Sequence, residues 1–196
     1  MIAVVDYGAG NLLSICRALE LSGEAVIVAK KRSELEQANG IVLPGVGSFS
    51  CLSRLRPLRS SLRLLAQRKP FLGICLGMQA LFERSEEAPR VKGLNLLKGS
   101  VRRIPGRVRL PQMGWNSISM TRASALLKGI RNGERFYFAN SYACFPEEDV
   151  ITAVCDYGGE FAAVVEKGNF FGVQFHPEKS GEAGLRVLKN FVELCR

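Results

Sequence analysis

The chain is poor in the residues that build metal centres. Only one of its 196 residues is histidine, His176, so any imidazole-dependent chemistry must be carried by that side chain. The cysteines include no closely spaced pair of the kind that holds zinc, and we expect no metal. We expect most of them to be small, buried, reduced thiols, with a disulfide as the alternative in a hyperthermophile. The six are Cys16, Cys51, Cys75, Cys144, Cys155 and Cys195.

Long hydrophobic runs are also missing. The longest apolar stretches are strand-sized, too short to cross a membrane, and residues 1–6 lack the basic region and cleavage site of a signal peptide. We therefore expect a cytoplasmic protein without a membrane partner. At 196 residues, 47% hydrophobic and 23% charged, the chain can bury one substantial core. We expect a single domain over residues 1–196, without repeats or linkers.

A formal net charge of +9 is a reason to consider a nucleic-acid partner. The arginines, however, are spread over separate predicted elements, and the chain has neither a recognised nucleic-acid module nor interleaved aromatic residues. We therefore expect a solvated basic surface, or one that faces an acidic partner, and no nucleic acid. The arginines concerned are Arg54, Arg56, Arg59, Arg63, Arg102, Arg103, Arg107 and Arg109.

Strand and helix patterns alternate in the first half of the chain. Short β-rich runs lie at 2–5, 25–29, 41–43 and 71–74, and amphipathic helical stretches lie around 12–21, 33–38 and 58–67. This alternation predicts an α/β fold with a mostly parallel central sheet flanked by helices. Beyond residue 99 we expect short strands, such as 136–138, 150–154, 162–165 and 170–173, and a closing helix over 183–194.

A cysteine stands between two glycines in the segment Gly73-Ile74-Cys75-Leu76-Gly77. Gly-x-Cys-x-Gly is the thiol version of the nucleophile elbow, in which a strand turns sharply into a helix and presents the reactive side chain at the apex. Residues 70–74 read as a buried strand, and 76–82 repeat apolar residues at helical spacing. A side chain at either glycine would crowd the turn. The helix dipole favours a thiolate at Cys75; a buried structural cysteine is the alternative.

The single histidine lies in the segment Phe175-His176-Pro177-Glu178. An imidazole can take the thiol proton and later give a proton to the leaving group, while a carboxylate on its other nitrogen fixes its orientation. We expect Pro177 to keep the segment extended, which places Glu178 on the same side as His176. Cys75, His176 and Glu178 then form a candidate catalytic triad. The alternative is a core histidine beside a surface glutamate.

Acyl transfer through a thioester also needs main-chain N–H donors aimed at the developing oxyanion. The N–H of Leu76, directly after the cysteine, is one candidate. The segment Pro44-Gly45-Val46-Gly47 is a second candidate, although Pro-Gly-x-Gly is also an ordinary turn sequence. Sites in open parallel sheets form at the carboxyl ends of strands. Because Gly45, Cys75 and His176 all follow predicted strands, we expect them to converge there.

These residues carry a resemblance to a known family. Two segments resemble the signatures of class I (triad-type) glutamine amidotransferases, and four more narrow the resemblance to the glutaminase subunit of imidazole glycerol phosphate synthase. The similarity covers nearly the whole chain, in the family's order, and implies a flavodoxin-like fold with a nucleophile elbow. The two signature segments are 73–79 and 175–180, and the four others are 6–12, 44–49, 113–116 and 140–142.

The resemblance implies a glutaminase that forms a γ-glutamyl thioester on Cys75 and needs no cofactor. It implies that the N–H of Val46 joins that of Leu76 at the oxyanion. It also implies a glutamine pocket in which Glu87 meets the ammonium group of the substrate, whereas a solvated acidic run at a helix end is the alternative for that residue. The residues implied to line the pocket are Gly47, Gln79, Glu87, Ser141 and Tyr142.

The resemblance further implies a heterodimer with a TIM-barrel cyclase subunit. Ammonia would pass into this partner, which makes imidazole glycerol phosphate and an aminoimidazole carboxamide ribotide during histidine biosynthesis. The contact surface would include Asn11, Trp115 and Lys179.

Two positions depart from the family pattern, because Gln112 and Asn140 stand where many members have histidine. Amides cannot change charge near neutral pH, so the substitutions put in doubt any contribution of those imidazoles to communication with the partner. Two alternative functions stay open. The glutaminase of pyridoxal phosphate or anthranilate synthesis is disfavoured by segments 6–12 and 114–116. A non-catalytic scaffold is disfavoured by the intact set of Cys75, His176 and Glu178.

Overall fold

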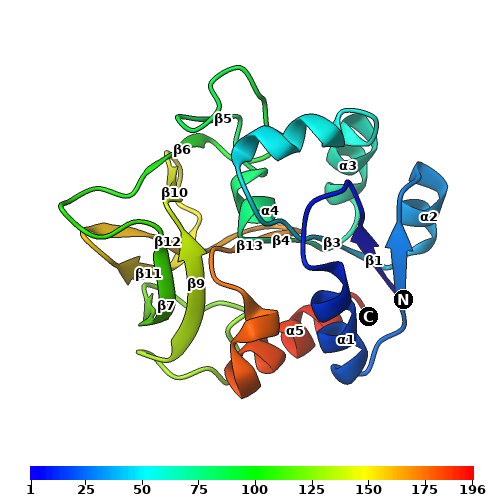
Figure 1. The fold of residues 1–196 in the computed structure, drawn as a ribbon. Helices are drawn as coiled ribbons and strands as arrows, with labels where there is room; N and C mark the ends of the chain where they lie inside the picture. The colour runs from blue at the N-terminus through cyan, green and yellow to red at the C-terminus, as the bar shows by residue number, and fades with distance from the viewer.

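The computed structural model describes residues 1–196 and is built on a large central sheet (Figure 1). One half of this sheet is parallel, in the order β2-β1-β3-β4-β13. The parallel sheet predicted from alternating strands and helices is confirmed, and its strand order is that of the flavodoxin-like class. The five strands are β1 (Ile2–Val5), β2 (Val26–Ala29), β3 (Gly40–Leu43), β4 (Phe71–Ile74) and β13 (Phe170–Val173).

The other half of the sheet is mainly antiparallel. It continues from β13 through β12 (Glu160–Lys167), β10 (Tyr142–Pro146), β6 (Gly99–Arg103) and β5 (Arg84–Ser85), with only β5 and β6 parallel. β11 (Ile151–Asp156) and β8 (Ser119–Met120) branch from β12. A separate hairpin-like sheet joins β7 (Gln112–Ser117) to β9 (Arg135–Asn140). The change to short strands beyond residue 99 is therefore confirmed.

Helices cover both faces of the parallel half, as Figure 1 shows. Side chains alternate along each strand: on β1, Ile2 and Val4 enter one core, whereas Ala3 and Val5 enter the other. The first core is closed by α1 (Leu12–Leu21) and α5 (Gly181–Leu194). The second is closed by α2 (Arg32–Gln37), α3 (Arg59–Ala66) and the 3-10 helix η1 (Phe49–Leu55). Burial on both faces explains the apolar sequences of the inner strands β1, β3 and β4, in which every residue is buried.

The helix after the cysteine is shorter than predicted. α4 spans only Leu76–Gln79, because the carbonyl oxygens of Ala80 and Leu81 accept hydrogen bonds from Leu94 and Leu96 in a returning loop. Ala80, Leu81 and Phe82 are fully buried without being helical. Their apolar spacing therefore reflects burial in the core and not a continued helix.

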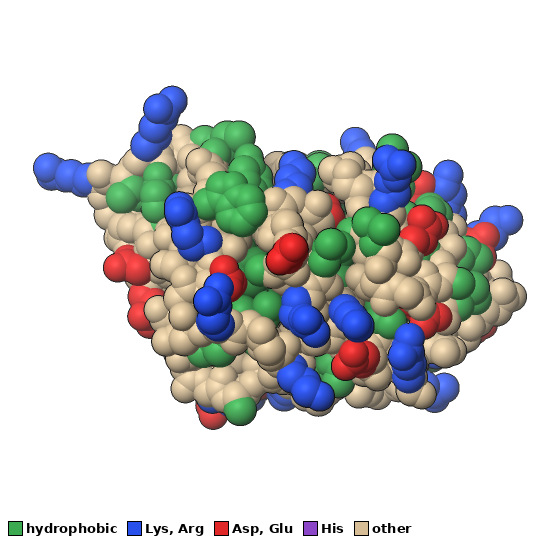
Figure 2. Space-filling model, turned by 90° about the horizontal axis from the view of Figure 1, so that it is seen from below, with side chains coloured by type: hydrophobic (Ala, Val, Ile, Leu, Met, Phe, Trp, Pro, Cys, Tyr) green, Lys and Arg blue, Asp and Glu red, His purple; other side chains and the backbone are tan.

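The surface carries its charge in many separate places. Figure 2 shows lysine and arginine side chains spread across the face seen from below, with a hydrophobic cluster toward one side. None of the helices combines the length and the apolar character needed to span a membrane. All six cysteines are free thiols, three of them buried and three partly exposed.

Candidate functional site

Cys75 lies at the sharp turn between β4 and α4. Its backbone has φ of 53° and ψ of −108°, a conformation that residues other than glycine rarely adopt. The N–H of Cys75 donates to the carbonyl oxygen of Val173 at 2.8 Å, and its own carbonyl accepts from Gln79 at 3.1 Å. The neighbouring strand and the first turn of the helix thus hold the strained residue in place, and the predicted elbow is confirmed.

The two glycines of the elbow occupy positions without room for a side chain. A Cβ on Gly77 would overlap the carbonyl oxygen of Leu43 at the end of β3, and a Cβ on Gly73 would overlap the carbonyl oxygen of Gly77. Both obstacles are main-chain atoms, so neither overlap can relax without moving the backbone. The expectation that a side chain would crowd this turn is confirmed.

The histidine follows β13 on a segment that changes direction at Pro177. The backbone of His176 is extended (φ −100°, ψ 96°), but Pro177–Lys179 form a 3-10 helix, η2. The prediction of an extended segment through Glu178 is wrong, because proline restricts the residue before it while favouring the first position of a helix. The turn brings Oε1 of Glu178 to 2.9 Å from Nδ1 of His176. Both side chains are at most 4% exposed.

The contacts of His176 favour its charged form. Burial alone would lower the pKa of this imidazole, because a low-dielectric interior penalises the imidazolium. Interactions with the neighbouring Cys75 and with Glu178 outweigh burial and raise the pKa of His176 from 6.5 to about 10. Because Nδ1 faces Glu178, Nε2 is the nitrogen available to Cys75. The geometry therefore favours an imidazolium at His176 beside the sulfur of Cys75.

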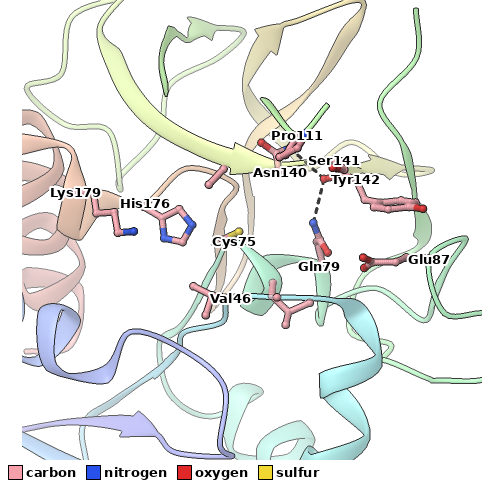
Figure 3. A pocket seen from close by; sticks show the side chains of 13 residues that line it. Val46, Cys75, Gln79, Glu87, Pro111, Asn140, Ser141, Tyr142, His176 and Lys179 are labelled. Atoms are coloured by element: carbon pink, nitrogen blue, oxygen red, sulfur yellow. Dashed lines mark hydrogen bonds between the residues drawn. The ribbon is translucent and has the colours of Figure 1, made fainter. Parts of the chain in front are cut away.

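A cavity of about 340 Å³ opens beside Cys75. Figure 3 shows His176 and Lys179 on one side of the sulfur and Gln79, Glu87 and Tyr142 on the other. All the residues implied for substrate binding and for the oxyanion lie in its wall, whereas Glu178 lies behind His176 and outside the cavity. The lining comprises Val46, Gly47, Cys75, Leu76, Gln79, Glu87, Pro111, Ala139, Asn140, Ser141, Tyr142, His176 and Lys179.

Glu87 is fixed in the wall of the cavity. Its Oε2 atom accepts a hydrogen bond from the N–H of Phe49 at 2.6 Å, and the contact is partly buried. This bond ties the carboxylate to the segment that directly follows Gly47 and Ser48. Glu87 is therefore an ordered group of the site, and the alternative of a freely solvated acidic run does not describe it.

The segment that contains Val46 packs directly on the elbow. A Cβ on Gly45 would lie 2.6 Å from both Cβ of Leu76 and the hydroxyl oxygen of Tyr7. The same hydroxyl donates to the carbonyl oxygen of Pro44 at 3.0 Å. The N–H of Val46 donates to no acceptor within the protein, which leaves it available to a ligand. The main-chain segments that contain the two expected oxyanion donors, the N–H groups of Val46 and Leu76, are thus in contact.

Sequence reasoning missed Gln174, which is fully buried and contacts the candidate nucleophile. Its Nε2 donates to Sγ of Cys75 at 3.6 Å, and its Oε1 accepts from Nε2 of Gln79 at 3.4 Å. A signal was present in the sequence. Gln174 is the one polar residue in the apolar run Phe170–Phe175, and it stands two residues before His176.

The residues implied for the partner interface occupy two places. Lys179 lines the cavity, with Nζ 5.6 Å from the centre of the Tyr137 ring. Tyr137 in turn meets Trp115 edge-on at 6.5 Å, and the indole is 49% exposed. Lys179 and Trp115 are therefore parts of one exposed cluster beside the cavity. Asn11 stands at the start of α1, and its side chain makes no capping hydrogen bond.

The two departures from the family pattern lie opposite one another. Gln112 and Asn140 are paired in register across β7 and β9, and both are buried. Nδ2 of Asn140 donates to the carbonyl oxygen of Tyr142 at 3.1 Å, and Nε2 of Gln112 faces Sγ of Cys155 at 3.8 Å. Oε1 of Gln112 and Oδ1 of Asn140 have no hydrogen-bond partner.

Comparisons with known proteins agree with this geometry. The model of the family "Glutamine amidotransferase class-I" matches residues 3–195. The chain is 50% identical over 200 residues to the imidazole glycerol phosphate synthase subunit HisH of Moorella thermoacetica, covering 100% of this chain and 95% of that protein. It is 48% identical over 196 residues to the subunit HisH of Methanocaldococcus jannaschii, covering 99% and 100%.

Solved structures show the same fold. The crystal structure of a glutamine amidotransferase superposes with a TM-score of 0.79 at 18% identity, covering 100% of this chain and 99% of the other. The structure of PurLQS from Thermotoga maritima gives a TM-score of 0.73 at 24% identity, covering 100% and 98%.

Proposed function

Because the chain belongs to the class I glutamine amidotransferase family, as a HisH glutaminase subunit of imidazole glycerol phosphate synthase, we propose that its cavity hydrolyses L-glutamine to glutamate and ammonia. The observation that supports this most directly is the strained Cys75 beside a buried imidazole whose far nitrogen is held by Glu178. A non-catalytic scaffold would not need a backbone conformation that costs about 1–3 kcal/mol.

The reaction begins at the sulfur. Sγ of Cys75 attacks the side-chain amide carbon of glutamine, while the thiol proton resides on His176. The tetrahedral intermediate places its negative oxygen between the N–H groups of Val46 and Leu76. His176 then protonates the leaving nitrogen, ammonia departs, and a γ-glutamyl thioester remains on Cys75. His176 takes a proton from water, whose oxygen attacks the thioester and releases glutamate.

The wall of the cavity offers groups for the charged end of free glutamine. The carboxylate of Glu87 provides the charge complementary to an α-ammonium group, and its anchoring by Phe49 keeps it in place without the substrate. Gly47, Gln79, Ser141 and Tyr142 complete the polar wall. Selecting a free amino acid requires such paired polar groups, because a substrate that lacks the matching charge leaves them unpaired.

We also propose that the ammonia is used by a cyclase subunit bound over the cavity, within histidine biosynthesis. The partner would make imidazole glycerol phosphate and an aminoimidazole carboxamide ribotide. The exposed cluster of Trp115, Tyr137 and Lys179 supports this arrangement, because it lies beside the cavity and presents aromatic surface. Asn11 is the further residue proposed for the contact.

Trapping the intermediate tests the proposed reaction. The chain, in complex with its cyclase, is mixed with radiolabelled glutamine and quenched in acid, and the labelled peptide is identified. We expect the label on the peptide that contains Cys75, and none in the Cys75→Ala variant. Label on another cysteine, or glutamate release by Cys75→Ala, would remove Cys75 as the nucleophile. If the chain is purified with its bound partners and no cyclase is among them, the proposed partner is contradicted.

A further inference from the structure

The sulfur of Cys75 has a second polar neighbour besides His176. Nε2 of Gln174 approaches Sγ at 3.6 Å from inside the core, and the glutamine side chain is fully buried. A carboxamide can present either its N–H₂ or its oxygen to a neighbour. The two orientations have opposite chemical effects here. The N–H stabilises a thiolate, whereas the oxygen would accept from S–H and stabilise the neutral thiol.

The hydrogen-bond network around Gln174 determines which end faces the sulfur. The carbonyl oxygen of Tyr142 can only accept, so the side chain of Gln79 must turn its Nε2 toward it, at 3.1 Å. The same Nε2 donates to Gln174 at 3.4 Å, so Gln174 must turn its Oε1 toward Gln79. Its Nε2 is left facing Cys75. A backbone carbonyl therefore fixes, through two amides, an N–H donor on the sulfur.

We propose that Gln174 is a further catalytic residue, which donates a hydrogen bond to Sγ of Cys75 and holds it as the thiolate that attacks the substrate. The inference rests on the proposed role of Cys75 as the nucleophile. Gln174 is neutral at every pH, so it supports the thiolate without competing with His176 for a proton. Gln79, which lines the cavity, is the positioning residue that keeps Gln174 in its donor orientation.

The arrangement suits the reaction cycle. The attacking sulfur is a thiolate, and hydrogen bonds to charged acceptors are stronger than those to neutral ones. When the thioester forms, the sulfur loses its charge and the bond weakens. The bond becomes strong again when water releases glutamate and the thiolate returns. Gln174 therefore stabilises the thiolate both as the attacking group and as the leaving group of the second step.

Alkylation of Cys75 by iodoacetamide tests the proposal without glutamine. The rate is measured across the pH range in the complex with the cyclase, and mass spectrometry of the Cys75 peptide separates it from the five other thiols. In Gln174→Met, which keeps the length of the side chain but removes the donor, we expect the rate on the acidic limb to fall about tenfold. The alkaline plateau, where the thiol is ionised in both proteins, should stay the same.

Three further variants complete the test. Gln79→Met leaves the amide of Gln174 free to rotate, so we expect a smaller fall on the same limb. Gln112→Met is the matched control, because Gln112 is also buried and its Nε2 also faces a cysteine sulfur, that of Cys155, at 3.8 Å. We expect it to leave the profile of Cys75 unchanged. If Gln174→Met fails to fold, Gln174→Glu keeps the shape and should lower the acidic limb by placing an acceptor at the sulfur.

The outcomes separate this inference from the proposed reaction. An unchanged profile in folded Gln174→Met or Gln174→Glu would overturn the role of Gln174, as would a fall of equal size at all pH values, which reports access to the sulfur and not its ionisation. Because the alkylation assay uses no glutamine, failure of the thioester trap would leave its result standing. If the trap succeeds and the alkylation profile is unchanged, the proposed role of Gln174 is wrong and the proposed glutaminase reaction remains.

Discussion

Cys75 carries a backbone conformation that an inert cysteine could avoid. Its φ of 53° with ψ of −108° penalises any residue with a Cβ by about 1–3 kcal/mol. We expect Cys75→Ala to abolish glutamate release and keep the strain, and Cys75→Gly to abolish activity while relieving it. Urea unfolding should therefore show Cys75→Gly to be more stable than Cys75→Ala by about 1–2 kcal/mol. Equal stabilities, or a less stable glycine variant, would contradict stored strain.

The single histidine makes its ionisation directly measurable. The pKa of His176 is raised from 6.5 to about 10, so the stability that its charged form contributes is fully present below about pH 6.5 and is lost as the pH rises through about 10. Removing a group that holds the imidazolium should lower this pKa. We expect NMR titration of labelled histidine to give a lower pKa in both Cys75→Ala and Glu178→Gln. A value unchanged in both would contradict the assigned contacts.

At the scale of elements, the start of α4 depends on its contact with the end of β3. We expect Gly77→Ala to cost at least about 1–3 kcal/mol and to lower glutaminase activity, because the new Cβ would displace the carbonyl of Leu43 and with it the segment that carries Val46. Gly133→Ala is the control, since a Cβ there meets nothing within 4 Å although its φ is 83°. Denaturant midpoints and turnover numbers should rank Gly77→Ala as the more damaging change.

The short helix η2 links the triad to the surface, since Glu178 and Lys179 are neighbours within it. We expect Lys179→Ala to reduce glutamine-supported synthesis by the complex more than synthesis supported by added ammonia. The lysine lines the mouth of the cavity but does not belong to the triad. The two syntheses are measured on the same preparation. Equal losses in both assays would indicate general damage to the complex and not a defect in coupling.

The elements that the sequence predicted well are those whose local pattern and burial agree. β1 and β4 are apolar at every position except the glycine of β4, because both faces are buried, and their bounds match the prediction. α4 was predicted too long, because the loop that returns over Ala80 and Leu81 comes from residues 94–97. The turn at Pro177 has a local cause. Proline keeps the residue before it extended, but it also favours the first position of a helix.

The residues of the candidate site also differ in how far the sequence could predict them. Cys75, His176 and the glycines of the elbow stand in recognisable local patterns, so they could be found from the sequence. The role of Gln174 depends on contacts with Cys75 and Gln79, which are 99 and 95 residues away along the chain. Such contacts leave little local pattern. A polar residue within the otherwise apolar run Phe170–Phe175, two residues before His176, was the available clue.

At the scale of the whole molecule, the oxyanion site offers a means of control by the partner. Rotation of one peptide plane next to Val46 exchanges a carbonyl oxygen for the N–H at the oxyanion position. A missing donor costs about 3–4 kcal/mol, or roughly a hundred- to a thousandfold in rate. We expect the isolated chain to be a poor glutaminase, activated when the cyclase and its nucleotide ligand bind, because they favour the competent orientation.

Turnover of glutamine by the chain alone, with the cyclase, and with the cyclase plus nucleotide checks this expectation. Glutamate is measured at saturating glutamine in each case, with Cys75→Ala as the blank. Comparable rates in the three samples would rule out control at Val46, while the roles of Cys75 and His176 would remain.

The position of β13 has a consequence for how the protein is made. β13 pairs with β4 inside the sheet, yet residues 75–169 separate the two strands in the chain. At about 5–20 residues per second, a ribosome needs roughly 5–20 s to translate that interval. During this time one edge of β4 has no partner, and an unpaired apolar edge invites pairing with another chain. The nascent protein therefore depends most on chaperones while residues 75–169 are being translated, before residue 170 has emerged to close the sheet.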